Sequence, residues 1–244
     1  MEIEMIEKYL PENKIFTRQE LCKIAEKLDS DFKETLLRNM LEKLLINGDV
    51  VRVAHNKYML NHGTNKKLIY ENRYSEKAER IISEMKEKYP LLDYQVWELN
   101  WLNEFWNHQI AGNKIFLEVE NMGCDFVYAE MSERYNGGIL LRPSENELYR
   151  YGRNDTIIID RLVSEAPKGV PEKYNTPLEK IVVDLFANRK LKSMIHTGEY
   201  ATAISDMFEK YSIDQSKMFR YANRRNKKQE IIHFLKQETK IEFH

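Results

Sequence analysis

The sequence predicts a protein of mixed α and β structure in two parts: a small amino-terminal region of helices with one β-hairpin, and a larger α/β region that ends in a layer of helices. Three observations predict it: helical spacing of leucines up to residue 45, two short β-branched runs directly after it, and later β-branched runs that alternate with amphipathic segments. The 244 residues suit one large or two modest domains, and with 42% hydrophobic and 32% charged residues they exclude a disordered chain.

Three helices are expected at the amino terminus. Apolar residues at helical spacing predict the first over residues 2–10. The second begins after Thr17, because Thr17 and Glu20 stand at the spacing of a capping box. The third follows the polar residues 29–31 and ends at Gly48, a residue suited to a left-handed C-terminal cap.

A hairpin follows the third helix, with short strands at 50–53 and 57–60 around a tight turn. Three helices and a hairpin are the element order of a winged helix-turn-helix, which we place at residues 1–62. In that fold the third helix enters the major groove and the hairpin lies along the phosphates. Operator DNA is therefore the expected partner, with these contact residues: Arg18, Lys33, Thr35, Arg38, Asn39, Arg52, His55 and Lys57.

Charge leaves an alternative open. Residues 1–60 carry 10 Lys and Arg against 11 Asp and Glu, so the head is not net basic. A winged helix that binds protein and not DNA is the alternative. The net charge of the whole chain is −1, which excludes a uniformly basic nucleic-acid coat and leaves electrostatic steering to local patches.

The second region begins after a polar linker at 63–74 and fills residues 75–244. Its expected strands are 115–119, 139–141 and 156–159, and its expected helices are 75–89, 125–135, 144–150, 176–186, 199–211, 216–223 and 227–237. The helix over 176–186 begins with Thr176 as its cap, Pro177 in the first position and Glu179 bonding back.

Catalytic motifs are absent from the sequence: it has no phosphate-binding GxxxxGK loop, GxGxxG, HExxH, CxxC pair or GxSxG elbow. We therefore expect no enzyme, no catalytic residue, no metal and no cofactor. The alternative is a magnesium-dependent nuclease, in which Glu118 and Glu120 share one face of a strand and Asp125 assists them.

Two further clusters have competing interpretations. Trp97, Trp101 and Phe105 are four residues apart, which predicts one buried helical face beside a hydrogen-bonded His108, with a base-stacking platform as the alternative. No histidine stands at metal-ligand spacing to another. Residues 217–228 hold six cations and no acid, so they form either a solvated helix junction or a contact patch for DNA or an acidic partner. The patch residues are Lys217, Arg220, Arg224, Arg225, Lys227 and Lys228.

The expected compartment is the cytoplasm. Cys22 and Cys124 match no zinc spacing and suit small core residues in a reducing environment. The first ten residues carry three glutamates and one lysine, unlike a signal peptide. No apolar run approaches the roughly 20 residues of a membrane span, so no membrane partner is expected.

Four segments in order, 97–109, 162–167, 176–186 and 220–225, resemble bacterial proteins related to the AbiEi antitoxins. Asn188 and the His55-Asn56 turn depart from that pattern. The resemblance implies a winged-helix DNA-binding head on an α/β antitoxin domain. Such a protein represses its own operon and counteracts a nucleotidyltransferase toxin of the AbiEii type in abortive infection, a phage defence. A homodimer is compatible with this role.

Overall fold

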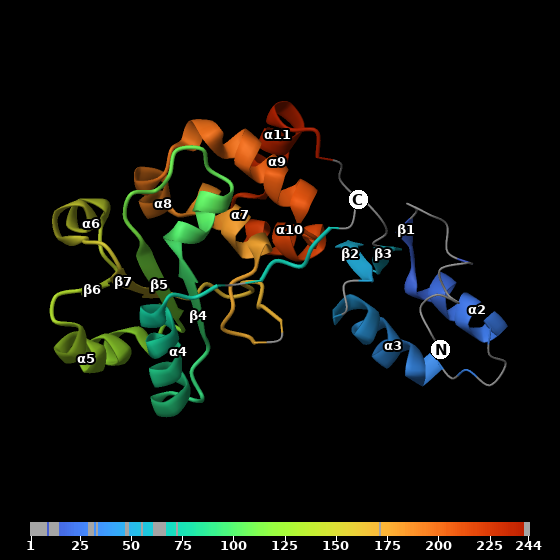
Figure 1. Cartoon of the computed structure of the whole chain (residues 1–244), viewed down its shortest axis with the longest axis horizontal. Coiled ribbons are helices and arrows are strands. Elements are labelled where there is room, and N and C mark those ends of the chain that lie inside the picture. The colour runs from blue at the N-terminus through green and yellow to red at the C-terminus, as the bar shows by residue number, and fades with distance from the viewer. Residues whose placement is uncertain are drawn as a thin grey trace. The chain divides into compact units, whose positions relative to one another are not determined.

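The structure is a computed structural model of mixed α and β content (Figure 1). It describes residues 15–28, 34–46, 49–54, 56–60, 67–71, 73–170 and 172–241, together with Tyr9 and Phe32. The chain divides into two compact units. The first holds Met1–Tyr70, Phe208–Lys217 and Ile241–His244, and the second holds Glu71–Met207 and Met218–Lys240.

The first unit contains β1 (Ile15–Phe16), α2 (Arg18–Leu28), α3 (Glu34–Ile46), β2 (Val50–Ala54) and β3 (Lys57–Leu60). Its sheet is antiparallel in the order β1-β3-β2. The two helices and the hairpin agree with the sequence prediction. Strand β1 was missed because two residues are too short to show any periodicity, and the helix expected over 2–10 lies outside the described residues.

An apolar core and a capping box hold this unit together. Leu21 of α2 and Leu37 of α3 are fully buried and pack with Phe16 of β1. The Thr17 N–H donates to Glu20 Oε2 at 2.7 Å and the Glu20 N–H donates to Thr17 Oγ1 at 3.3 Å, so the predicted capping box is confirmed. The hydrogen bonds to Thr17 lower the pKa of Glu20.

The second unit is built on a four-stranded sheet of β4 (Tyr94–Glu98), β5 (Lys114–Val119), β6 (Ile139–Leu141) and β7 (Thr156–Arg161). The strand order is β4-β5-β7-β6; β4 is antiparallel to β5, whereas β5, β7 and β6 run parallel. Three of these strands were predicted. Glu118 and Asp160 are register partners on the adjacent parallel strands β5 and β7.

Helices cover both faces of this sheet (Figure 1). Apolar side chains of α4 (Glu76–Lys88) and α5 (Cys124–Tyr135) pack on the face that carries Ile115 and Ile157. Residues of the opposite face meet α7 (Leu178–Ala187), where Glu118 pairs with Lys180. The remaining elements are η2 (Leu99–Glu104), α6 (Glu145–Tyr151), α8 (Arg189–Met194), η3 (Thr197–Glu199), α9 (Tyr200–Lys210), α10 (Gln215–Arg224) and α11 (Lys228–Glu238).

The structure corrects one cap. Thr176 does not cap α7: its hydroxyl donates to the Val96 carbonyl at 3.1 Å, and Pro177 occupies the N-cap position without a side-chain bond. A buried strand neighbour therefore competes for the threonine hydroxyl, which a local motif cannot reveal. Pro177 stands one position before the one that was predicted for it.

The aromatic cluster is buried as expected but is not a helical face. Trp97 lies in β4, Trp101 in η2 and Phe105 just after it, with exposed fractions of 1%, 8% and 4%. Trp97 stacks on Phe116 of β5 with ring centroids 4.4 Å apart. The four-residue spacing arose from a strand followed by a turn of 3₁₀ helix, so β4 was missed.

The cysteines are free; Cys124 is buried and Cys22 is partly buried against the core of the first unit. None of the helices in the described part of the chain has the length and apolarity that crossing a bilayer requires.

Candidate functional site

The exposed face of α3 is the first candidate surface. Leucines on one side of the helix, such as Leu37 and Leu41, are buried, which turns Arg38 and Asn39 outward. Arg38 has a side chain 75% exposed and pairs with Glu42 one turn along, at 3.2 Å. An exposed ion pair of this kind contributes little to stability. The Arg38 guanidinium can therefore leave Glu42 and bind a phosphate or a guanine edge at little cost in free energy.

The start of α2 and the hairpin turn of the first unit are in contact. The Arg18 N–H donates to Asn56 Oδ1 at 3.1 Å, which fixes the turn against the first residue of α2. Asn56 has a φ of 53°, in the left-handed region that asparagine tolerates. Arg18 and Lys57 are both exposed near this bond. The two cations are therefore anchored at the same corner of the unit.

Arg52, a predicted DNA contact, is paired within the chain. Its Nε lies 3.3 Å from Asp214 Oδ2, and the Asp214 side chain is only 5% exposed. The Arg52 guanidinium thus pairs with a residue of the first unit. Among the described residues of the hairpin, Lys57 is the exposed cation. Lys33 and His55 lie outside the described residues, and so does the side chain of Thr35.

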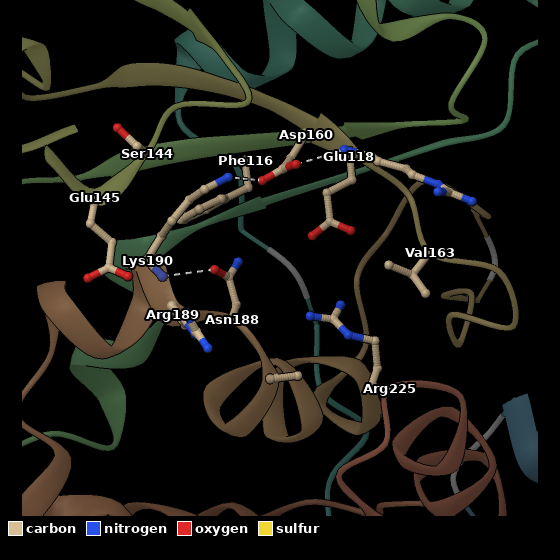
Figure 2. A pocket seen from close by; sticks show the side chains of 12 residues that line it. Phe116, Glu118, Ser144, Glu145, Asp160, Val163, Asn188, Arg189, Lys190 and Arg225 are labelled. Carbon is tan, nitrogen blue, oxygen red and sulfur yellow. Dashed lines mark hydrogen bonds and ion pairs between the residues drawn. The ribbon is translucent and has the colours of Figure 1, made fainter. Parts of the chain in front are cut away.

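The second candidate is a polar cavity of about 430 Å³ in the second unit. It lies beside Glu118 and Asp160, near the carboxyl ends of parallel strands, where open α/β sheets commonly bind ligands. Figure 2 shows the Glu118 carboxylate and the Arg225 guanidinium pointing into the same space. The lining residues are Phe116, Glu118, Ser144, Glu145, Asp160, Arg161, Val163, Ala187, Asn188, Arg189, Lys190 and Arg225.

A buried ionic network lies beside this cavity, and two of its members, Glu118 and Arg225, line the cavity. Lys180 Nζ donates to Glu118 Oε1 at 2.7 Å and to Asp184 Oδ2 at 2.5 Å. The other oxygen of Asp184 accepts from the Tyr221 hydroxyl at 3.0 Å and from Arg225 at 2.9 Å. Two carboxylates and two cations therefore balance one another at the joint between the sheet and helices α7 and α10.

The network perturbs its own members. Burial raises the pKa of Glu118, and the Lys180 charge opposes that rise. Burial alone would lower the pKa of Lys180, but the carboxylates of Asp184 and Glu118 outweigh it and raise the pKa, so the lysine stays charged. Burying these ions costs desolvation free energy that an apolar replacement would avoid. Ionisable groups with perturbed pKa values in a cleft are typical of a functional site.

The proposed magnesium trio does not assemble. Glu118 is bound to Lys180 on the α7 side, whereas Asp125 of α5 is paired with Arg142 at 3.0 Å. Within the described ranges, no group of metal-ligating side chains includes Glu118, Glu120 and Asp125. The shared metal site of the nuclease alternative is therefore not formed, because Asp125 lies in the first turn of α5, on the other face of the sheet.

The basic stretch 217–228 is largely engaged within the chain. Arg225 belongs to the buried network, and Arg224 donates to Ser164 Oγ at 2.6 Å. Lys227 pairs with Glu230, Lys217 lies 4.0 Å from Asp214, and Lys228 lies over the Phe219 ring. Arg220 is exposed. A DNA or partner contact by this stretch stays a prediction that rests mainly on Arg220 and Lys228.

No local pattern in the sequence indicates the cavity directly, since its lining comes from β5, α6, β7, α7, α8 and the residue that follows α10. One signal was present: Lys180 and Asp184 stand one turn apart in a helix whose other residues, apart from Glu179, are apolar. Charges at such positions are almost never fully buried unless paired. Asp160, an acid directly after the β-branched run 156–159, was the second signal.

The fold and these sites define a mixed α+β protein of two units, one with an exposed helix face and one with a polar cavity at a sheet end. The chain belongs to a family of unknown function, DUF6577, which matches residues 36–241. The match covers all of the second unit, both strands of the hairpin and most of α3. No curated protein matches the chain.

Proposed function

We propose that this protein is a winged-helix, DNA-binding regulator that acts in the cytoplasm as the antitoxin of a nucleotidyltransferase toxin, and that it is not an enzyme. The observation that carries the DNA-binding part is the element order β1-α2-α3-β2-β3 with the antiparallel sheet β1-β3-β2. That order supports α3 as the recognition helix and the β2–β3 hairpin as the wing.

The contacts follow from the exposed side chains. Arg38 and Asn39 suit base edges, because arginine pairs with guanine and asparagine with adenine. Arg18 and Lys57 suit phosphates on either side of the groove. With few phosphate contacts, the affinity should depend on salt only modestly, at about 0.9 log units per contact for each tenfold change in salt.

Support for the antitoxin part comes from where the resembling segments lie. Segment 176–186 supplies Lys180 and Asp184, and segment 220–225 supplies Tyr221 and Arg225. These four side chains and Glu118 of β5 form the buried network beside the cavity. Segments that resemble the AbiEi-related proteins therefore build one joint in the second unit, which we propose as the scaffold of the toxin-counteracting surface.

The proposal is tested with the full chain in two assays. Footprinting at moderate salt on the DNA upstream of its own gene should show a protected site. Co-expression with a nucleotidyltransferase encoded beside that gene should relieve the toxin's growth arrest. If the protein relieves the growth arrest but protects no DNA site, the alternative is favoured, namely a winged helix that binds protein only.

The nuclease alternative has its own test. The protein should leave DNA and RNA intact in Mg²⁺ and in Mn²⁺. Cleavage that Glu118→Gln abolishes would overturn the non-enzymatic assignment and place the chemistry in the polar cavity.

A further inference from the structure

Two loops of the second unit bring three metal-ligating side chains together. His108 lies in the loop between η2 and β5, His196 follows α8, and Glu199 ends η3. One donor atom from each lies within 4.8 Å of the others. The two imidazole rings have centroids 5.2 Å apart and stand 30° from parallel. His108, His196 and Glu199 are the one group of three or more such ligands in the part of the chain that the structure describes.

The carboxylate of Glu199 is oriented for a ligand. Its Oε2 accepts the backbone N–H groups of Asn107, at 2.6 Å, and of His108, at 3.4 Å. Its Oε1 faces both rings: it bonds His108 Nδ1 and lies 3.8 Å from His196 Nδ1. Burial alone would raise the pKa of Glu199, but the hydrogen bonds from the His108 ring and the two backbone amides outweigh burial and lower this pKa.

The surrounding loops hold this arrangement. The Trp106 indole N–H donates to the His196 carbonyl at 3.1 Å, which joins the two loops, and the Trp106 ring meets Tyr200 edge-on. Gly198 leaves space for the imidazole of His196, since a Cβ at that position would lie 3.0 Å from its Cε1. The rings are exposed, at 76% for His108 and 64% for His196, so a metal ion can reach them.

We propose that His108, His196 and Glu199 bind a divalent transition metal of the zinc class. Two imidazoles and one carboxylate are ligands that Zn²⁺ accepts, and three protein ligands leave a fourth tetrahedral position for water. Mg²⁺ and Ca²⁺ prefer sets of oxygen ligands and do not suit this group. The ion would clasp the 105–113 loop to η3. The site goes beyond the DNA-binding proposal and does not depend on it.

The geometry needs only a small adjustment. Zinc bonds of about 2.0 to 2.1 Å in a tetrahedron set neighbouring donors about 3.3 Å apart. The separation of 3.8 Å between His196 and Glu199 is close to that value. His108 instead forms a direct hydrogen bond to Glu199, so its exposed ring must move outward as the ion replaces the shared proton.

The test is a titration of the metal-free full chain with Zn²⁺, followed by calorimetry, and with Co²⁺, followed by its visible absorption. We expect one ion per chain at this site and tetrahedral Co²⁺ bands. His108→Asn and Glu199→Gln should each weaken Zn²⁺ binding at least about 10-fold. The matched control is His233→Asn, which alters an exposed histidine of α11 and should leave the affinity unchanged.

His108→Asn keeps a side chain that can donate to Glu199, so its loop should stay folded, and far-ultraviolet circular dichroism with urea unfolding checks this. Failure of the wild-type chain to bind Zn²⁺ at 100 µM would overturn the proposal. Equal affinities of wild type, His108→Asn and Glu199→Gln would overturn it too, because the bound ion would then lie elsewhere. Mg²⁺ in place of Zn²⁺ should give no saturable heat.

Discussion

Lys180 of α7 and Glu118 of β5 form an ion pair at 2.7 Å, with side-chain exposures of 0% and 9%. Asp184, one helical turn after Lys180, accepts a hydrogen bond from the same ammonium and another from the Arg225 guanidinium. The pair therefore joins β5, an inner strand of the sheet, to α7, which lies on the face opposite α4 and α5. Removing one partner would leave the other charges buried without compensation.

Lys180→Met should destabilise the second unit by about 3 to 5 kcal/mol, the usual cost of leaving buried charges without their partner. All three tryptophans lie in this unit, so urea unfolding followed by tryptophan fluorescence reports on it directly. A loss below about 1 kcal/mol would show that the network is open to water.

The matched control removes Lys180 together with both carboxylates that it pairs with, so that only the Arg225 guanidinium, whose side chain is 19% exposed, keeps its charge. A triple variant, Lys180→Met with Glu118→Gln and Asp184→Asn, should recover part of the stability that the single variant loses, because no uncompensated carboxylate remains. If the triple variant is less stable than Lys180→Met, steric packing and not charge explains the effect.

The hairpin turn should respond differently to two small residues at position 56. Asn56→Gly keeps the left-handed backbone available and loses only the bond to the Arg18 N–H. Asn56→Ala loses the same bond and adds left-handed strain, so it should be less stable by about a further 1 kcal/mol. Amide hydrogen exchange along α2 measures both, since no tryptophan lies in the first unit. Asn39→Ala, an exposed change on α3, should leave that exchange unchanged. Equal effects of Gly and Ala would remove the role of the backbone conformation.

Acid should weaken the hydrogen bonds that Glu199 accepts from Asn107 and His108. Because the pKa of this carboxyl is lowered in the folded protein, its contribution to stability is present above the unfolded value, about 4.3, and is lost as the pH falls through the folded pKa. The stability difference between wild type and Glu199→Gln should shrink as the pH falls from about 5 towards 3. Urea unfolding across this range measures it. Glu238→Gln, at an exposed position on α11, serves as the control. A difference that stays constant down to pH 3 would contradict the assignment.

A phosphate contact by Lys57 has a distinct signature. Lys57→Ala should weaken binding to every DNA sequence by a similar factor and reduce the salt dependence by about one contact. Fluorescence anisotropy with specific and scrambled duplexes at several salt concentrations separates the two effects. Lys236→Ala removes the same charge from α11 of the second unit and should change neither quantity. A loss confined to the specific duplex would move Lys57 from the phosphates to a base.

Local patterns in the sequence predicted most elements because their causes are local. The Thr17 and Glu20 box set the start of α2, and the alternating apolar residues of 115–119 marked β5. Strand β4 was hidden by the spacing of Trp97 and Trp101, which imitates a helix. Its true neighbours are the residues of β5, and pairing between strands leaves no trace in a single segment.

The candidate sites were harder to predict because they are assembled from distant segments. His108 and His196 stand at no metal-ligand spacing along the chain, yet two loops bring them to one carboxylate. Arg52 was assigned to DNA from its place in the hairpin, but Asp214, far along the sequence, holds its guanidinium. Arg38 and Asn39 were predicted to be exposed and are exposed, because the leucines of α3 alone set that face.

The most direct test of the central claim compares wild type with Arg38→Ala on DNA upstream of the protein's own gene, by footprinting at moderate salt. Wild type should protect a defined site. Arg38→Ala should lose about 1 to 3 kcal/mol of specific binding and keep its affinity for unrelated DNA. No protection by wild type, or identical protection by Arg38→Ala, would contradict the assignment of α3 as the recognition helix.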